Sequence, residues 1–176
     1  EPNDRGAIQM KKLLITLSLI LGATPILAEN IDITGTVQSR CTVNMDTPGA
    51  YGNPNAFTLT TLPSSSGQEP IVRFDVTLAN AYHAQVSYPT AFTSSPSLSD
   101  TVAWTGTVLV AQMSSSDQSG YQAASTTSGS MRQYALAHAG TLWVKATSIA
   151  VYGGGQAKAF PGGSYKSVVL ASCVAQ

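Results

Sequence analysis

The chain has 176 residues, of which only 10% are charged, and its nine Lys and Arg balance its nine Asp and Glu. Without net charge or a basic cluster, it lacks the electrostatic signature of proteins that bind nucleic acid or anionic membrane surfaces. Its abundant Ser, Thr, Ala and Gly favour a polar but uncharged surface, as secreted structural proteins often have.

The N-terminal region has the parts of a Sec-type export signal. Met10 is followed by two lysines and by a short apolar run over 13–21, and Ala28 offers a cleavage site. This order is typical of a secretory signal, and the run is shorter than the roughly 20 apolar residues that span a bilayer. We therefore expect residues 10–28 to be a signal peptide. The alternative interpretation is a buried N-terminal helix.

Export sets the expected bounds of the mature chain, which begins at Glu29 and is destined for a compartment outside the cytoplasm. Residues 1–9 precede the initiator Met10, and we interpret them as upstream sequence translated from a wrong start or as a remnant of an expression vector. They are set aside from the fold for that reason. The length of the mature chain fits one domain with its own hydrophobic core.

The chain has two cysteines, Cys41 and Cys173. An even number of cysteines in an exported chain predicts one disulfide, which here would tie the first mature strand to the last. The enclosed loop is long, so a bond of this kind stabilises the fold by at most about 5 kcal/mol. The alternative is a pair of free, buried thiols.

Short segments with alternating apolar and polar residues, rich in β-branched and aromatic side chains, recur along the mature chain. They cover 31–43, 57–62, 71–79, 84–88, 101–113, 141–152 and 165–175. Seven to eight such strands, separated by Pro and Gly, predict an all-β sandwich. Helix signals are weak: 131–138 is a candidate for two helical turns, and 114–129 is predicted to be a surface loop.

No arrangement of residues typical of an enzyme is visible. His83 and His138 are isolated from other metal-ligand types, no Ser lies in a nucleophile pattern, and no Gly-rich loop opens a helix. We therefore expect no catalytic, metal-binding or cofactor-binding residues, although a pair of carboxylates assembled by the fold stays an alternative. Trp104 and Trp143 lie in predicted strands and are expected in the core rather than on a ligand-binding surface.

Both ends of the mature chain carry sequence patterns of a known protein family, and the first lies at the N-terminus. In the N-terminal segment, Ile31, Ile33, Gly35 and Val37 occupy alternate positions, directly after the predicted cleavage site. With its central glycine, this segment resembles the donor-strand extension of the pilus subunits that the chaperone–usher pathway of Gram-negative bacteria assembles. The alternative is an ordinary first strand of a complete sandwich.

The C-terminus is similar to the last strand of the same family. That strand follows a Pro/Gly turn and a Gly-x-Tyr sequence, which here correspond to Pro161, Gly163 and Tyr165, and it continues through Val169. Two features depart from the family pattern. Ala175 replaces the near-terminal aromatic residue of many members, and the second cysteine is Cys173 rather than one in the first half. A late cysteine resembles the invasin-like tip subunits of this pathway.

The resemblance implies an immunoglobulin-like sandwich that lacks its last strand, with residues 29–40 as the donor extension and 41–176 as the pilin-like domain. A periplasmic chaperone would fill the gap first. At the outer-membrane usher, the extension of a neighbouring copy or of another pilus subunit would then replace the chaperone. The implied function is a structural subunit of a surface fimbria that serves cell adhesion. The alternatives are a tip adhesin or invasin of the same pathway and an unrelated secreted periplasmic β-sandwich protein.

Overall fold

The computed structural model describes residues 35–36, 38–115, 118–153 and 158–176. Thr36–Gln176 is one compact unit, and the fold below is that of this unit. The predicted signal peptide and the predicted donor residues Ile31, Ile33 and Val37 lie outside the described residues. None of the helices in the described part is long and apolar enough to cross a membrane.

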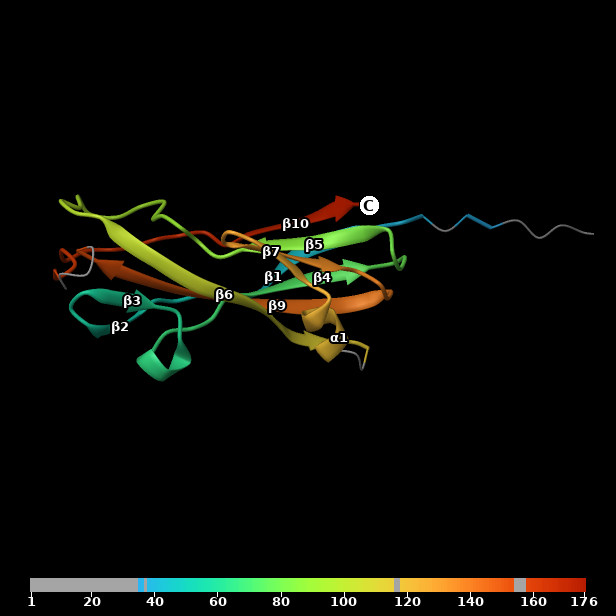
Figure 1. Ribbon diagram of the computed structural model, residues 1–176, viewed down its shortest axis with the longest axis horizontal. Helices are drawn as coiled ribbons and strands as arrows, with labels where there is room; N and C mark the ends of the chain where they lie inside the picture. The colour runs from blue at the N-terminus through green and yellow to red at the C-terminus, as the bar shows by residue number, and fades with distance from the viewer. Residues whose placement is uncertain (1–34, 37, 116–117, 154–157) are drawn as a thin grey trace, which may run out of the picture. The chain divides into compact units, whose positions relative to one another are not determined.

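The unit is an all-β sandwich of two antiparallel sheets (Figure 1), which confirms the predicted fold class. The first sheet has the order β1 (Cys41–Thr47), β4 (Ile71–Val76), β9 (Gly140–Tyr152), β3 (Thr58–Thr60), β2 (Gly52–Asn55), with β6 (Val102–Met113) also paired to β9. The second sheet has the order β10 (Leu170–Ala175), β5 (Tyr82–Ser87), β8 (Met131–Ala135), β7 (Thr126–Ser128). Helical structure is limited to η1 (Pro63–Ser65) and α1 (Gln118–Ala123) in this part of the chain.

The core lies between the inner faces of the two sheets. In β4, Val72, Phe74 and Val76 are buried, whereas the alternate residues are half-buried on the outer face. Leu142 and Val144 of β9 lie opposite Phe74 and Val72, so the same alternation continues into the next strand. Each such buried aliphatic side chain contributes roughly 1.5–3 kcal/mol before entropy is counted.

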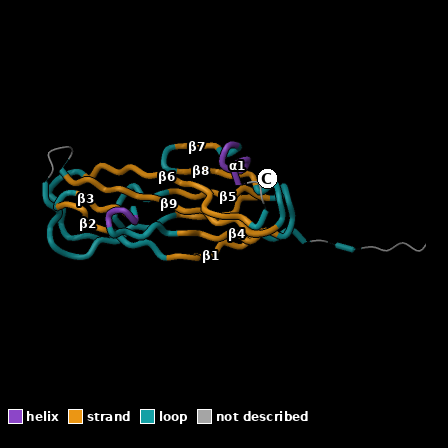
Figure 2. The backbone as a smooth tube through the Cα atoms, turned by 90° about the horizontal axis from the view of Figure 1, so that it is seen from below, coloured by secondary structure: helices purple, strands orange, loops and turns teal. Residues whose placement is uncertain are grey.

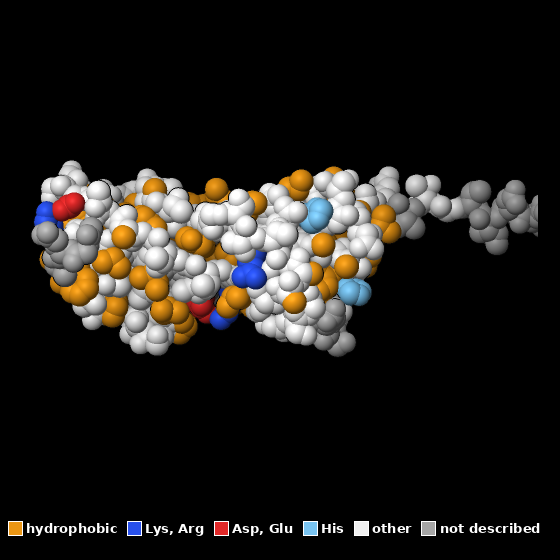
Figure 3. Space-filling view, viewed as in Figure 1, with side chains coloured by type: hydrophobic (Ala, Val, Ile, Leu, Met, Phe, Trp, Pro, Cys, Tyr) orange, Lys and Arg blue, Asp and Glu red, His pale blue; other side chains and the backbone are white. Residues whose placement is uncertain are grey.

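The longest strands, β6 and β9, run side by side in Figures 1 and 2. They are longer than the strands of the second sheet, so part of the first sheet is covered by the connecting segments instead. On the face in Figure 3, charged side chains are few and scattered, as the composition predicts.

Two local predictions are wrong. The segment 131–138 is not a helix, because Met131–Ala135 form β8 and pair with β5, and the three residues that follow are irregular. Tyr134 and Leu136 are at most 1% exposed, so burial of alternate side chains against the sheet outweighs the helix propensity of the segment. The predicted loop 114–129 contains α1 and β7, although short irregular stretches remain between them.

The last strand begins later than predicted. The sequence predicts one strand over 165–175, but continuous pairing with β5 starts only at Leu170. Before that point, Lys166 makes a single bridge to Ser94. Alternation nevertheless continues through the whole segment, with half-buried residues at 165, 167, 169, 171 and 173 and exposed residues between them. The inner row of this segment therefore forms one wall of the groove described next.

Candidate binding groove between two sheet edges

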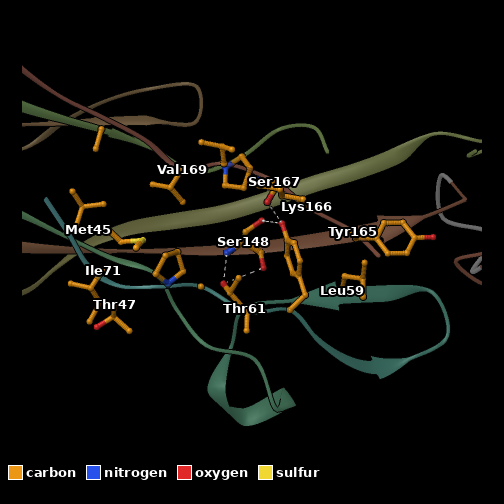
Figure 4. Close-up of a pocket in the computed structure, with 18 of the residues that line it drawn as sticks. Met45, Thr47, Leu59, Thr61, Ile71, Ser148, Tyr165, Lys166, Ser167 and Val169 are labelled. Carbon is orange, nitrogen blue, oxygen red and sulfur yellow. Dashed lines mark hydrogen bonds between the residues drawn. The ribbon is translucent and has the colours of Figure 1, made fainter. Parts of the chain in front are cut away.

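An open groove of about 910 Å³ lies between β1 and the C-terminal segment 165–171 (Figure 4). One wall consists of side chains of β1, and the other of the inner row of the C-terminal segment. Leu59, Thr61 and Ser148 are buried at its base. Lys166 is the single charged residue among those that line it.

The β1 wall presents two apolar side chains to the groove, although Asn44 and Thr47 also border it, and β1 is polar on the outer face of its sheet. Val43 and Met45 line the groove and are 37% and 76% exposed. On the outer face, the Asn44 amide donates to Asp75 (3.2 Å), and Asp46 accepts a hydrogen bond from the indole of Trp143 (3.0 Å). The polar side of β1 thus has partners within the sheet, whereas its apolar side faces open space.

The opposite wall has the same character. Val169, Ala171 and Cys173 pack against the core from the inner row of the C-terminal segment, and Val169 and Ala171 also line the groove. β10 pairs only with β5 among the described residues, and β1 pairs only with β4. Each wall therefore ends in a strand whose second edge has no partner strand in this part of the chain.

The disulfide between Cys41 and Cys173 joins these two edges, as the cysteine count predicted. The Cα atoms of the two residues are 6.1 Å apart, and the two strands belong to different sheets. Because Cys41 and Cys173 start β1 and nearly end β10, the bond closes one end of the groove and holds its walls at a fixed separation.

A chain of hydroxyl groups crosses the middle of the groove. The Tyr51 hydroxyl lies 2.5 Å from Ser167 Oγ and 3.4 Å from Ser148 Oγ. Ser148 is held from below, because its backbone N–H donates to Thr61 Oγ1 (2.9 Å) and its carbonyl accepts from the Thr61 N–H (2.9 Å). Figure 4 shows Ser148 between Thr61 and Ser167.

Aromatic side chains close the other end of the groove. The ring of Phe92 lies 4.7 Å from Trp104 and 5.0 Å from Tyr165, and Phe160 lies 5.1 Å from Tyr165. The Tyr165 hydroxyl donates to the Pro161 carbonyl (2.6 Å). Burial, and after it the neighbouring Tyr152, raises the pKa of Tyr165, so its hydroxyl keeps the proton that it donates.

The structure places the predicted C-terminal residues along this groove. Gly163, Tyr165 and Val169 all line it. Gly163 has φ +146°, and a Cβ there would lie 2.5 Å from Pro96 Cγ, so the turn before Tyr165 requires glycine. Gly35 is described, and a Cβ on it would meet no atom within 4 Å.

Other residues were missed or misplaced by sequence reasoning. Trp143 is half-buried on the outer face of its sheet, so its expected core position is wrong, whereas Trp104 is half-buried in the aromatic cluster. Met45 could have been found, because it continues the alternation of Cys41 and Val43. Tyr51 could not, since its partner Ser167 is 116 residues away.

The described residues hold no group of three or more His, Cys, Asp or Glu that is placed to bind a metal ion. His138 lies beside Tyr121, with Nδ1 3.1 Å from the hydroxyl, in a second, small pocket that shares no lining residue with the groove. The chain matches no protein-family model, no curated protein and no solved structure.

Proposed function

We propose that the protein is a non-catalytic, structural subunit of a surface pilus, polymerised by donor-strand exchange and serving cell adhesion. The observation that carries the proposal is the apolar groove between the second edges of β1 and β10. The sandwich would be an incomplete immunoglobulin-like domain, filled first by a periplasmic chaperone and then, at the outer-membrane usher, by the extension of another subunit.

The groove has the physical features of a strand acceptor. An unpaired sheet edge presents backbone N–H and C=O groups that can pair with an added strand. Val43 and Met45 on one side, and Val169 and Ala171 on the other, are spaced by two residues. They match the alternate side chains of a strand laid between them. A strand with aliphatic residues at alternate positions would cover the exposed side chain of Met45.

The occupant we propose is the segment 29–40 of a second copy. Ile31, Ile33 and Val37 share one face of this segment if it is extended. Between Ile31 and Val37 the one charged residue is Asp32, and it lies on the other face. At roughly 3.3 Å per residue, the stretch from Ile31 to Val37 is long enough to follow the inner row of the C-terminal segment.

The course of the chain just before β1 favours a neighbouring copy over the chain's own segment. The Arg40 N–H donates to Thr77 Oγ1 (2.9 Å), and the Thr77 N–H donates back to the Arg40 carbonyl (3.0 Å). Thr77 follows Val76, which lies opposite Cys41, so Arg40 lies beyond the disulfide while the groove begins at Val43. The chain thus enters β1 from the end away from its own groove.

The test is to express variants with a chaperone and an usher and to measure surface fibres, SDS-resistant ladders and chaperone-bound subunit. Ile31→Asp or Ile33→Asp would bury an unpaired charge, so fibres and ladders should be lost while chaperone-bound subunit remains. Asp32→Asn and Thr34→Ser, on the other face, should assemble normally. Normal fibres from Ile33→Asp would refute the donor role, and loss of chaperone-bound subunit would place the segment in the subunit's own sandwich.

The late position of Cys173 supports a second candidate, a tip adhesin or invasin of the same pathway that binds a host or surface ligand. A tip subunit needs the groove but no donor extension. Deletion of residues 29–37 separates the two candidates. A fibre subunit without the extension cannot fill the groove of a neighbouring subunit and should be lost from fibres, whereas a tip subunit should still be displayed.

A further inference from the structure

Half of the charged side chains in the described part of the chain lie on one surface, the outer face of the first sheet. That part has ten Lys, Arg, Asp and Glu residues. Five of them lie on or beside strands β1, β4 and β9, on the outer face: Asp46, Glu69, Arg73, Asp75 and Lys145. Because the chain has so few charges, this concentration sets the outer face of the first sheet apart from the rest of the surface.

The carboxylates on this face are held by hydrogen bonds from β9. Four successive outer-face residues of β9 each donate to a carboxylate: Thr141 to Asp75 (2.9 Å), Trp143 to Asp46 (3.0 Å), and Lys145 and Thr147 to Glu69 (3.1 and 2.6 Å). Asp75 and Glu69 also form ion pairs, with Arg73 and Lys145. Asp46 instead accepts from the indole and from the Thr47 hydroxyl (3.0 Å), so its charge is not neutralised by a cation in the described part of the chain. A fixed, exposed carboxylate of this kind can accept further hydrogen bonds from a ligand.

The indole of Trp143 lies flat across β4. Trp143 is on β9, and Asp46, which accepts its N–H, is on β1, two strands away. Arg73 of β4 lies opposite Trp143, and the ring passes beside it, on the side of Ile71, to reach Asp46. The Arg73 guanidinium extends the other way, because its Nε and Nη2 both bond to Asp75 (3.1 Å each). One face of the ring therefore lies against the sheet and the other is open to solvent, in agreement with the half-burial of Trp143.

Side chains that form hydrogen bonds border the open face of the ring. Gln112 on β6 lies opposite Trp143, on the side away from β4, and is exposed. Asn44 on β1 donates its amide N–H to Asp75 (3.2 Å), and its side-chain oxygen has no hydrogen-bond partner among the described residues. Together with Asp46, these groups place amide and carboxylate oxygens around an apolar ring face.

We infer that this platform, formed by Trp143, Asp46, Asn44 and Gln112, binds an uncharged saccharide. A pyranose ring has an apolar face of C–H groups, which packs on an indole face, and hydroxyl groups at its rim, which pair with carboxylates and amides. Three carboxylates against two cations on this face disfavour an acidic ligand, and a quaternary ammonium group is usually bound by a cage of several aromatic rings. The inference goes beyond the proposed pilus function and does not depend on the groove, because the platform lies on the outer face of the sheet.

The experiment measures binding of the mature chain to an array of immobilised oligosaccharides, both neutral and sialylated. We expect binding to neutral oligosaccharides that share one terminal sugar, and Trp143→Ala should weaken it about tenfold or more. Trp104→Phe, the matched change at the other tryptophan, should bind as the unaltered protein does, because Trp104 belongs to the aromatic cluster around Phe92. Ile33→Asp should also bind normally, which separates saccharide binding from pilus assembly.

A second readout does not require replacement of Trp143. In the Trp104→Phe protein, Trp143 is the one remaining tryptophan, so tryptophan fluorescence reports on the platform alone. The saccharide selected on the array should change that emission over the concentrations at which it binds. The inference is overturned if no neutral oligosaccharide binds, if sialylated ones are preferred, if Trp143→Ala binds equally well, or if the emission is unchanged at saturation. Should Trp143→Ala fail to fold by circular dichroism, the fluorescence result decides.

Discussion

Replacing both cysteines with serine tests how far the crosslink between the groove walls stabilises the protein. In the Cys41→Ser/Cys173→Ser variant, the denatured chain regains the freedom of a loop with a sequence separation of 132 residues. The chain-entropy treatment gives about 5 kcal/mol for a loop of this length at 25 °C. Small domains are stable by roughly 5–15 kcal/mol in total, so the variant should lose a third or more of its free energy of unfolding.

The structure adds a local reason for a large effect. Within the described residues, β1 and β10 are each paired on one side only, and no backbone hydrogen bonds of a sheet join them across the groove. The disulfide is the covalent link between them. Without it, we expect amide hydrogen exchange to accelerate first in β10, and later in the central strands β4 and β9. Binding of a donor peptide should restore part of the lost stability, because a ligand that binds only the folded state adds to its free energy of unfolding.

The assay is urea unfolding followed by circular dichroism, with the unfolding free energy and its denaturant dependence fitted together. Reduction of the unaltered protein should reproduce the change, and reductant should have no effect on the double serine variant. A loss below about 1 kcal/mol with an unchanged denaturant dependence would contradict the reasoning, because the loop would then contribute far less than its length implies.

Two further predictions concern side chains away from the groove. Burial opposes ionisation of Glu69, but hydrogen bonds from Thr147 (2.6 Å) and Lys145 (3.1 Å), together with the Lys145 charge, outweigh it and lower the pKa below its usual 4.5. The contribution of the Glu69 carboxylate to stability is therefore complete above pH 4.5 and is lost as the pH falls through the lowered pKa. The melting temperatures of Glu69→Gln and the unaltered protein should therefore differ at pH 7 and converge below pH 4.5. Tyr134 is 0% exposed and donates to the Val108 carbonyl (3.0 Å), so Tyr134→Phe should lower the urea-derived free energy of unfolding by about 1–3 kcal/mol; a change within error would mean that water reaches that carbonyl.

Alternation along the chain was sufficient to predict the sandwich, because burial on one face of a strand leaves a period of two in the sequence. It predicted β6 and β9 to within one residue at each end, and it predicted the start of β4 but placed the end of that strand three residues too late. It failed at β8, where Ala135 and Leu136 suit a helix locally and only pairing with β5 selects the extended form. The position of Trp143 failed for a related reason, since parity alone does not say which face of a strand is the inner one.

The groove was only partly predictable. Alternation identified the first and last strands, and the cysteine count indicated that these two strands meet. Both signals can be read from the sequence without knowing how distant segments pack. The hydrogen bond between Tyr51 and Ser167 depends on how two segments far apart in the sequence pack above Ser148 at the base of the groove. No short-range sequence pattern encodes this contact. The aromatic cluster around Phe92 is likewise an outcome of packing between connecting segments, which carry no periodic signal.

The other sheet edges are protected against pairing with an added strand, unlike those of β1 and β10, which we propose to receive one. β6 is also an edge, yet Gln122 accepts from the Val110 N–H (2.9 Å), and Gln118 donates to the Val110 carbonyl (3.1 Å). Side chains of α1 thus take the place of a neighbouring strand there. β2 contains a proline, and β7 has only three residues, both common protections against unwanted pairing.

β1 and β10 have none of these protections within the described residues. Neither strand contains proline or points a charged side chain into the groove, and Met45 is 76% exposed beside it. A fold that blocks three of its edges and leaves two facing each other across an apolar groove is poorly explained by chance exposure, because an open apolar edge is a hazard for aggregation. It is well explained if, as we propose, one added strand covers both edges. By the same reasoning, a strand bound in the groove should raise the protein's free energy of unfolding, because it would bind only the folded state.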